Sequence, residues 1–301
     1  MDLNGDGNID ILSGSYSRME NDMAGLFQVL YGAKDGTFAK PTAVLGTDGE
    51  PLIIDTDGSE GDVDIGRICT RPTAVDIDGD GNLDIVTGNF GGTFAVFWGG
   101  AEGFDPLSSM LTNTKGKNLH VAHHSDPTFA DWDGDGDLDL ISGSDGGGVV
   151  MFPNVGSKTE PSFGKSVTLV KPAPEPNWGG PTQFGDDHIQ GPGRSTRVSV
   201  ADVNGDGKHD LLIGDAASIN TPAEGLSIEE CRKRMAEWEK EMQAIQKDMP
   251  RFESQEDWEN MTDEETKAFE AAQEKMMKHY DKRATFINER STGFVWLLIQ
   301  E

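Results

Sequence analysis

Four acidic loops in the sequence carry oxygen-bearing side chains at a constant spacing. They read DLNGDGNID from Asp2, DIDGDGNLD from Asp76, DWDGDGDLD from Asp131 and DVNGDGKHD from Asp202. In each loop, Asp or Asn occupies positions 1, 3, 5 and 9, and glycine occupies positions 4 and 6. Glycine lets the backbone turn tightly at positive φ, and calcium takes six to eight oxygen ligands with flexible geometry. The spacing therefore predicts four calcium loops.

The candidate calcium ligands are the side chains at positions 1, 3, 5 and 9 and the backbone carbonyl of the variable position 7. These residues are Asp2, Asn4, Asp6, Asn8, Asp10, Asp76, Asp78, Asp80, Asn82, Asp84, Asp131, Asp133, Asp135, Asp137, Asp139, Asp202, Asn204, Asp206, Lys208 and Asp210. The alternative, an acidic turn without a metal, would leave clustered carboxylates repelling one another. An EF-hand is excluded because position 12 lacks the required Glu and is Ser13, Thr87, Ser142 or Ile213.

Short β-branched runs must position these loops. ILSGS, IVTGN, LISGS and LLIGD follow the four loops, and RPTAVDI, DPTFADW and TRVSVAD precede the last three. Each of these three loops is therefore expected to join two strands of a hairpin. A further apolar strand follows in every unit, and a weaker strand such as SVTLV at 166–170 comes next. Four antiparallel strands in a repeated unit predict a propeller blade.

The loop pattern and the strand after it resemble FG-GAP (VCBS-type) repeats, the calcium-loop blades of the integrin α-subunit propeller. The resemblance covers nearly all of residues 1–215 and 291–301. It implies an all-β fold, a β-propeller of four-stranded blades with calcium in the loop between the first two strands. Such propellers occur in adhesion proteins, lectin-like proteins and some polysaccharide lyases. Four loops are fewer than the family's usual blades, so we expect an incomplete or composite ring.

A helical hairpin is predicted at 226–283, between the propeller blades at 1–225 and a final propeller strand at 284–301. Its first helix has a capping box at Ser227 and Glu230, and its second begins at TDEE, 262–265. The expected apolar positions are Ile228, Cys231, Met235, Trp238, Met242, Ile245 and Met249, then Phe269, Ala272, Met276 and Tyr280. The hairpin either binds a partner or packs on itself and the blade.

A ligand site is expected on the face opposite the calcium loops, because the long irregular connections all fall there. Arg71, Asp126 and Arg197 each precede a loop by five residues and should ring the channel's mouth, with His124 and His188 nearby. These five residues form the candidate site for a carboxylated or hydroxyl-rich ligand. The alternative is an ion-pair ring that only closes the channel. Zinc binding by 120–126 is disfavoured because adjacent strand side chains point to opposite sides.

Composition limits the partners and the compartment. The formal net charge of −28 in 301 residues argues against nucleic acid and anionic membranes, and no apolar run reaches the ~18 residues that span a bilayer. Calcium loops without a bidentate Glu should bind at roughly 10⁻⁴–10⁻³ M, which predicts an extracellular or periplasmic protein. The chain shows no signal peptide, and Met1 directly precedes a ligand, so we expect an incomplete N-terminus.

The expected function is a calcium-binding module for a carbohydrate or protein ligand. The alternative is a polysaccharide-active, lyase-like enzyme that uses the Arg, His and Asp cluster. The sequence contains no nucleophile elbow, phosphate loop or dinucleotide fingerprint, so it does not favour an enzyme.

Overall fold

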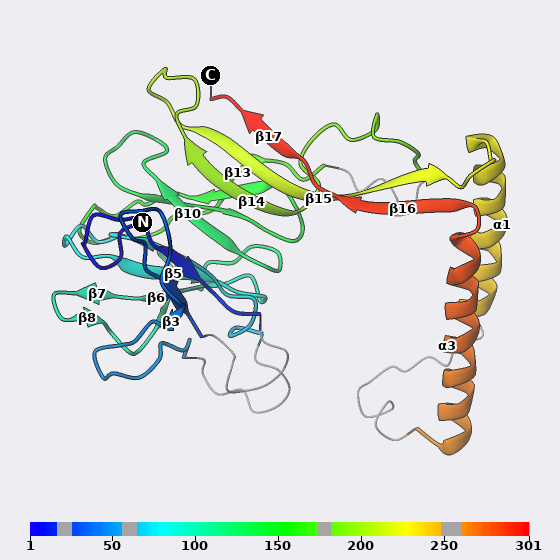
Figure 1. Ribbon diagram of the computed structural model, residues 1–301, viewed down its shortest axis with the longest axis horizontal. Helices are drawn as coiled ribbons and strands as arrows, with labels where there is room; N and C mark the ends of the chain where they lie inside the picture. Colours follow the sequence, from blue (N-terminus) through cyan, green and yellow to red (C-terminus); the bar gives the residue numbers. More distant parts are fainter. Residues whose placement is uncertain (17–25, 56–64, 174–181, 248–260, 301) are drawn as a thin grey trace. The chain divides into compact units, whose positions relative to one another are not determined.

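The computed structural model describes residues 1–300 except 17–25, 56–64, 174–181 and 248–260 (Figure 1). Over these residues the chain is mainly β, with four small antiparallel sheets in a propeller-like arrangement and two helices. A further two-stranded ribbon joins β7 (Gly99–Gly100) to β8 (Gly103–Phe104). The expectation of an all-β propeller with a helical insertion is thus confirmed in its coarse form.

The four sheets follow one another along the chain. The first contains β1 (Ile11–Ser13), β2 (Gln28–Leu30) and β3 (Thr42–Ala43). The second contains β4 (Arg71–Val75), β5 (Asp84–Gly88), β6 (Phe94–Phe97) and β9 (Ser109–Met110). The third contains β10 (Asp126–Ala130), β11 (Asp139–Gly143), β12 (Val149–Phe152) and β13 (Val167–Val170). The fourth contains β14 (Arg194–Ala201), β15 (Asp210–Pro222), β16 (Ile287–Thr292) and β17 (Val295–Leu298).

The last three acidic loops close β-hairpins, as predicted. Val75 pairs with Asp84 at the loop end of β4 and β5, and the same register recurs in β10–β11 and β14–β15. Glycine makes these tight turns because Gly79 and Gly81 have φ values of 67° and 92°, which side chains with a Cβ rarely adopt. The repeated loop sequence therefore fixes the position of each hairpin end.

The core lies between neighbouring sheets. β5 and β11 are buried along their whole length, which explains why adjacent positions, such as Ile85 and Val86, are both apolar instead of alternating with polar ones. Ile85 of β5 packs towards the first sheet, while its neighbour Val86 packs towards the third. Leu140 and Ile141 of β11 divide in the same way between the second and fourth sheets. Successive side chains therefore join each sheet to both of its neighbours.

The same contact, which we call a glycine lock, repeats between neighbouring sheets: a glycine packs against a Ser or Thr of the next sheet, and the residue after the glycine bonds to it. The Asn89 N–H donates to Ser125 Oγ at 2.9 Å, and the Ser125 N–H donates to the Asn89 carbonyl at 3.1 Å. A Cβ on Gly88 would lie only 2.1 Å from the Ser125 carbonyl oxygen. Equivalent locks join Gly14 and Ser15 to Thr70, and Gly143 and Ser144 to Thr196. Gly214 occupies the same place in the fourth sheet but has nothing within 4 Å of an added Cβ.

The two helices, α1 (Ile228–Lys247) and α3 (Asp263–Arg283), lie side by side (Figure 1). Trp238 Nε1 donates to the His279 carbonyl at 2.7 Å, His279 Nε2 bonds the Trp238 carbonyl at 2.8 Å, and the two rings stack. The second helix begins at TDEE as predicted, with Thr262 and Glu265 forming a capping box. Of the capping box predicted at Ser227 and Glu230, the bond from the Glu230 N–H to Ser227 Oγ is present at 3.2 Å. Tyr280, which was predicted on the apolar face, is 52% exposed, although its ring centroid lies 5.5 Å from that of Trp238, and the neighbouring His279 is buried. Met249 lies outside the described residues.

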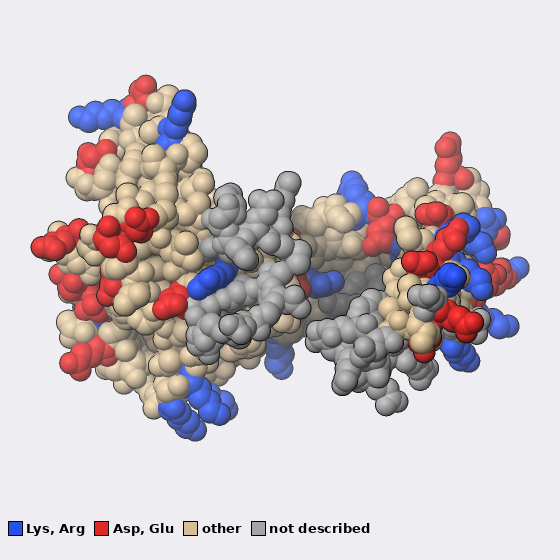
Figure 2. Space-filling model, turned by 90° about the horizontal axis from the view of Figure 1, so that it is seen from below, with Lys and Arg blue, Asp and Glu red and all other residues tan. Residues whose placement is uncertain are grey.

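The chain divides into two compact units. The propeller unit is Met1–Ala173, Gly191–Ala216 and Gly293–Glu301, and the helical unit is Pro174–Gln190 and Ala217–Thr292. β15 belongs to both, pairing with β17 in the first and with β16 in the second. Acidic side chains gather along the left edge of the propeller unit, with basic ones above and below them, whereas acidic and basic side chains are intermixed on the helices (Figure 2). Neither described helix is long and apolar enough to cross a membrane.

Candidate functional site

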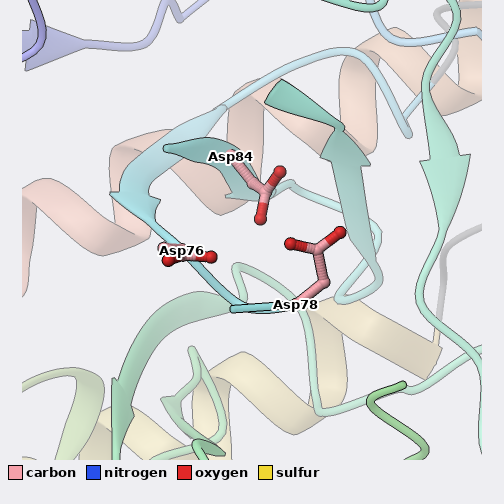
Figure 3. A group of neighbouring side chains, drawn as sticks. All are labelled: Asp76, Asp78 and Asp84. Carbon is pink, nitrogen blue, oxygen red and sulfur yellow. The ribbon is translucent and has the colours of Figure 1, made fainter. Parts of the chain in front are cut away.

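The second and third acidic loops gather carboxylates into compact groups. Oxygens of Asp76, Asp78 and Asp84 lie within 4.8 Å of one another, and Figure 3 shows these three side chains around a common space. Asp131, Asp133 and Asp135 form the corresponding group in the third loop. Three converging carboxylates supply only oxygen donors, the ligand set preferred by hard cations such as calcium.

Several oxygens in these loops are buried without a hydrogen-bond partner. They include Oδ1 of Asp76 and Oδ1 of Asp131, which occupy the same first position of the two loops. Buried polar atoms are nearly always paired, because an unpaired one loses its hydration without compensation. A cation between the carboxylates of each loop would satisfy that loop's unpaired oxygen. The residues present therefore fit a metal ion.

Burial first, and the neighbouring carboxylates second, raise the pKa of two aspartates in these loops. Burial raises the pKa of Asp84 to about 6, with further increases from Asp78 and Asp80, although backbone N–H groups act in the opposite direction. The pKa of Asp137 also rises to about 6, first through burial and then through the neighbouring Asp135 and Asp139. Asp137 was expected to act through its backbone carbonyl. Its side chain is buried, and Oδ1 has no hydrogen-bond partner among the described residues, while the role of its carbonyl stays a prediction.

The ninth-position aspartates have a structural role that the sequence analysis missed. Asp84 Oδ2 accepts from the Ile77 N–H at 3.0 Å within the loop, and Oδ1 accepts from the Gly99 N–H at 2.7 Å after β6. The same pair of bonds recurs at Asp10 with Leu3 and Gly32, at Asp139 with Trp132 and Asn154, and at Asp210 with Val203 and Gln300. Each ninth aspartate therefore ties its loop to the segment that follows β2, β6, β12 or β17 in the same sheet.

The first and fourth loops are arranged differently. Asp2 accepts hydrogen bonds from the N–H groups of Gly5, Asp6 and Gly7 at 2.8–3.1 Å, and Asp202 does the same in the fourth loop. The third-position Asn4 and Asn204 donate to the fifth-position aspartates. Among the described residues, three carboxylates close enough to share one metal ion are found only in loops two and three. In these two loops, Asp80 and Asp139 lie outside the groups of three.

Position seven supports the loop backbone. The Asn82 N–H donates to Asp80 Oδ1 at 2.7 Å, and its side-chain amide donates to Oδ2 at 2.9 Å. Asn8 makes the corresponding two bonds to Asp6, while Lys208 provides only its N–H to Asp206. These bonds come first among the causes that lower the pKa of Asp80, Asp6 and Asp206.

The candidate ligand residues lie at the other end of the hairpins. Arg71 pairs with Gly88, Asp126 with Gly143 and Arg197 with Gly214, so the three occupy the same register in successive sheets. Arg71 Nη1 donates to the His124 carbonyl at 3.5 Å, and Arg197 Nη1 donates to the Thr196 carbonyl at 2.7 Å.

The three charged side chains influence one another. Burial raises the pKa of Asp126, whereas Arg197, Arg71 and the Val198 N–H act to lower it. Burial lowers the pKa of Arg197, and the like charge of Arg71 adds to this effect. The structure thus brings Arg71, Asp126 and Arg197 together in the propeller unit.

The histidines of the candidate site fall in different units. His124 lies beside Arg71, and its Nδ1 is buried without a partner; burial and the charge of Arg71 lower its pKa. His188 belongs to the helical unit, where both of its ring nitrogens are buried without a partner among the described residues. Asp145, which the sequence analysis did not identify, accepts from Ser195 Oγ at 2.5 Å and from Arg194 at 3.4 Å. It lies two residues after the end of β11, directly after Ser144, which corresponds to Asn89 of the second sheet.

Comparison with known proteins agrees with the repeat geometry. A family model described as an FG-GAP-like repeat matches residues 76–142 and 131–213, each match beginning at an acidic loop. No curated protein and no solved structure matches the chain significantly.

Proposed function

Because the chain carries FG-GAP-like repeats in a β-propeller arrangement, we propose that it is a calcium-stabilised binding module. The observation that supports this most directly is the repeated group of carboxylates with buried, unpartnered oxygens at Asp76 and Asp131. Calcium suits these loops better than zinc, which prefers nitrogen and sulfur ligands, or magnesium, which demands near-ideal octahedral geometry.

Calcium would hold the loop ends of the hairpins, which leaves the opposite ends free to bind a ligand. Arg71, Asp126 and Arg197 lie at those opposite ends, one in each of three successive sheets. Binding residues are commonly carried at the ends of a rigid scaffold. We place the ligand there, on the face away from the calcium loops.

The expected affinity for calcium indicates the cellular compartment of the protein. Oxygen loops without a bidentate Glu are expected to fill only at roughly 10⁻⁴–10⁻³ M calcium. Such concentrations occur outside the cytoplasm, so we propose an extracellular or periplasmic location. The ligand is a carbohydrate or a protein.

Thermal unfolding with and without calcium tests the proposal. At about ten times the dissociation constant, each occupied site should stabilise the folded protein by about 1.4 kcal/mol, and EDTA should remove the gain. Asp76→Asn and Asp131→Asn should each reduce the gain. Asp35→Asn is the matched control, because Asp35 is an exposed aspartate that accepts hydrogen bonds from Thr37 outside the four loops.

Calorimetric titration should show at least two calcium ions, and magnesium at the same concentration should stabilise less. Identical melting curves in calcium and EDTA would refute the calcium proposal.

A further inference from the structure

A positive centre lies within a strongly acidic protein. The chain has a formal net charge of −28, yet Arg71 and Arg197 stand on either side of Asp126 in the register of three successive sheets. All three side chains are half-buried, which reduces the screening of their charges by water. A local excess of positive charge is therefore maintained against the charge of the whole chain.

Most hydrogen-bond donors of the two arginines are unused. A guanidinium offers five N–H donors, but among the described residues Arg71 and Arg197 each make one side-chain bond, to the carbonyls of His124 and Thr196. Within the described part of the chain, neither guanidinium lies within 4.0 Å of a carboxylate oxygen. Asp126 therefore moderates their charge without occupying their donors.

The net charge around Arg71 and Arg197 can be balanced by one negative group of a ligand. Arg71 and Arg197 contribute two positive charges, and Asp126 contributes one negative charge. Asp145 is neutralised by its ion pair with Arg194 at 3.4 Å. The nearby His124 stays neutral at pH 7, because burial and the arginine charge lower its pKa. One positive charge therefore remains for a ligand, and long polyanions are disfavoured by the net charge of the protein.

We propose that Arg71 and Arg197 form a clasp for a single carboxylate of the ligand. The inference rests on the proposed binding function and gives that site its chemistry. The planar fork of a guanidinium matches the two oxygens of a carboxylate. The carboxylate belongs to an otherwise uncharged molecule, either a sugar acid or a chain terminus. The competing interpretation is that the arginines and Asp126 only close the channel.

The test uses the full chain in calcium at constant ionic strength. Binding of D-glucuronate, N-acetylglycine and D-glucose is measured by calorimetry and by the shift in melting temperature. Glucuronate carries the sugar carboxylate, N-acetylglycine carries the chain-terminal carboxylate, and glucose is the uncharged counterpart of the sugar acid. The wild-type protein should bind at least one of the two carboxylates and should bind glucose far more weakly.

Arg71→Gln and Arg197→Gln should each weaken carboxylate binding about tenfold or more, since each removes a charge-assisted pair of bonds. Arg71→Lys keeps the charge but removes the fork, so its affinity should fall between those of wild type and Arg71→Gln. Arg290→Gln is the matched control, because Arg290 is an exposed arginine of β16 in the helical unit. Its affinity should equal that of wild type.

Equal responses of the wild-type protein to glucuronate, N-acetylglycine and glucose would overturn the clasp, whether or not the variants fold. Full carboxylate binding by both Gln variants would also overturn it. Calcium stabilisation is measured in the same samples. Its persistence when carboxylates fail to bind would reject the clasp alone, and its absence would reject the proposed function itself.

Discussion

Gly88 and Gly214 occupy equivalent places in the second and fourth sheets but have opposite surroundings. A Cβ on Gly88 would lie 2.1 Å from the Ser125 carbonyl oxygen and 2.8 Å from its hydroxyl oxygen, where ordinary contacts begin at 3.4 Å. A Cβ on Gly214 would meet nothing within 4 Å. Neither glycine has a positive φ, so alanine is strained at neither backbone. Comparing alanine substitutions at Gly88 and Gly214 therefore measures how much the glycine lock contributes to stability.

Gly88→Ala should lower the free energy of unfolding by roughly 2–6 kcal/mol. Overpacking of this severity costs about 1–3 kcal/mol, and moving Ser125 away also weakens its two bonds with Asn89, each contributing about 0.5–1.5 kcal/mol. Gly214→Ala should be neutral or stabilise by up to about 1 kcal/mol, because alanine restricts the unfolded chain.

Urea unfolding in calcium, followed by tryptophan fluorescence, measures the difference. Gly143→Ala should behave like Gly88→Ala, because its Cβ would lie 2.3 Å from the Thr196 carbonyl oxygen. Equal unfolding midpoints for Gly88→Ala and Gly214→Ala would mean that the lock does not hold the sheets together.

Other substitutions test the loops and the helices. Asp84→Ala should lower the melting temperature even in EDTA, because it leaves two backbone N–H groups unpaired at about 1–3 kcal/mol each. Asp80→Ala, at an exposed position, should change the EDTA melt little, and equal EDTA melts would refute the structural role of Asp84. His279→Ala should destabilise the helical unit by about 2 kcal/mol through loss of the Trp238 stack and bond, measured by circular dichroism at 222 nm. Thr262→Ala should destabilise α3 by about 1 kcal/mol, seen as faster amide exchange in its first turn; unchanged exchange would contradict the capping box.

The sequence predicted the hairpins and the strand-end charges because both follow from local rules. Glycines at fixed loop positions require tight turns, and counting five residues back from each loop places Arg71, Asp126 and Arg197 in one register. The two bonds of each ninth aspartate could not be foreseen in full. The bond within the loop is local, but the partner that follows β2, β6, β12 or β17 depends on strand pairing.

Helical periodicity alone did not distinguish His279 from Tyr280. Both rings contact Trp238 of the facing helix, but Tyr280 remains 52% exposed and His279 is buried. His279 is buried because its Nε2 reaches the Trp238 carbonyl while its ring stacks on the indole. Specific pairing across two helices therefore outweighed general hydrophobicity.

The division of β15 between two partners has a consequence for the order of folding. The first half of β15 can pair with β17 only after the helical segment has been synthesised. The bond from the Gln300 N–H to Asp210 therefore spans 90 residues, whereas the bond from the Asn154 N–H to Asp139 spans only 15. Contacts between distant residues form slowly, because a long loop must close first. The third sheet can form while the rest of the chain is being synthesised. The fourth sheet can be completed only after the residues of α1 and α3 have been synthesised. Early pairing of β15 with β16 would shorten that search by bringing Gly293 to Asp215 before β17 aligns.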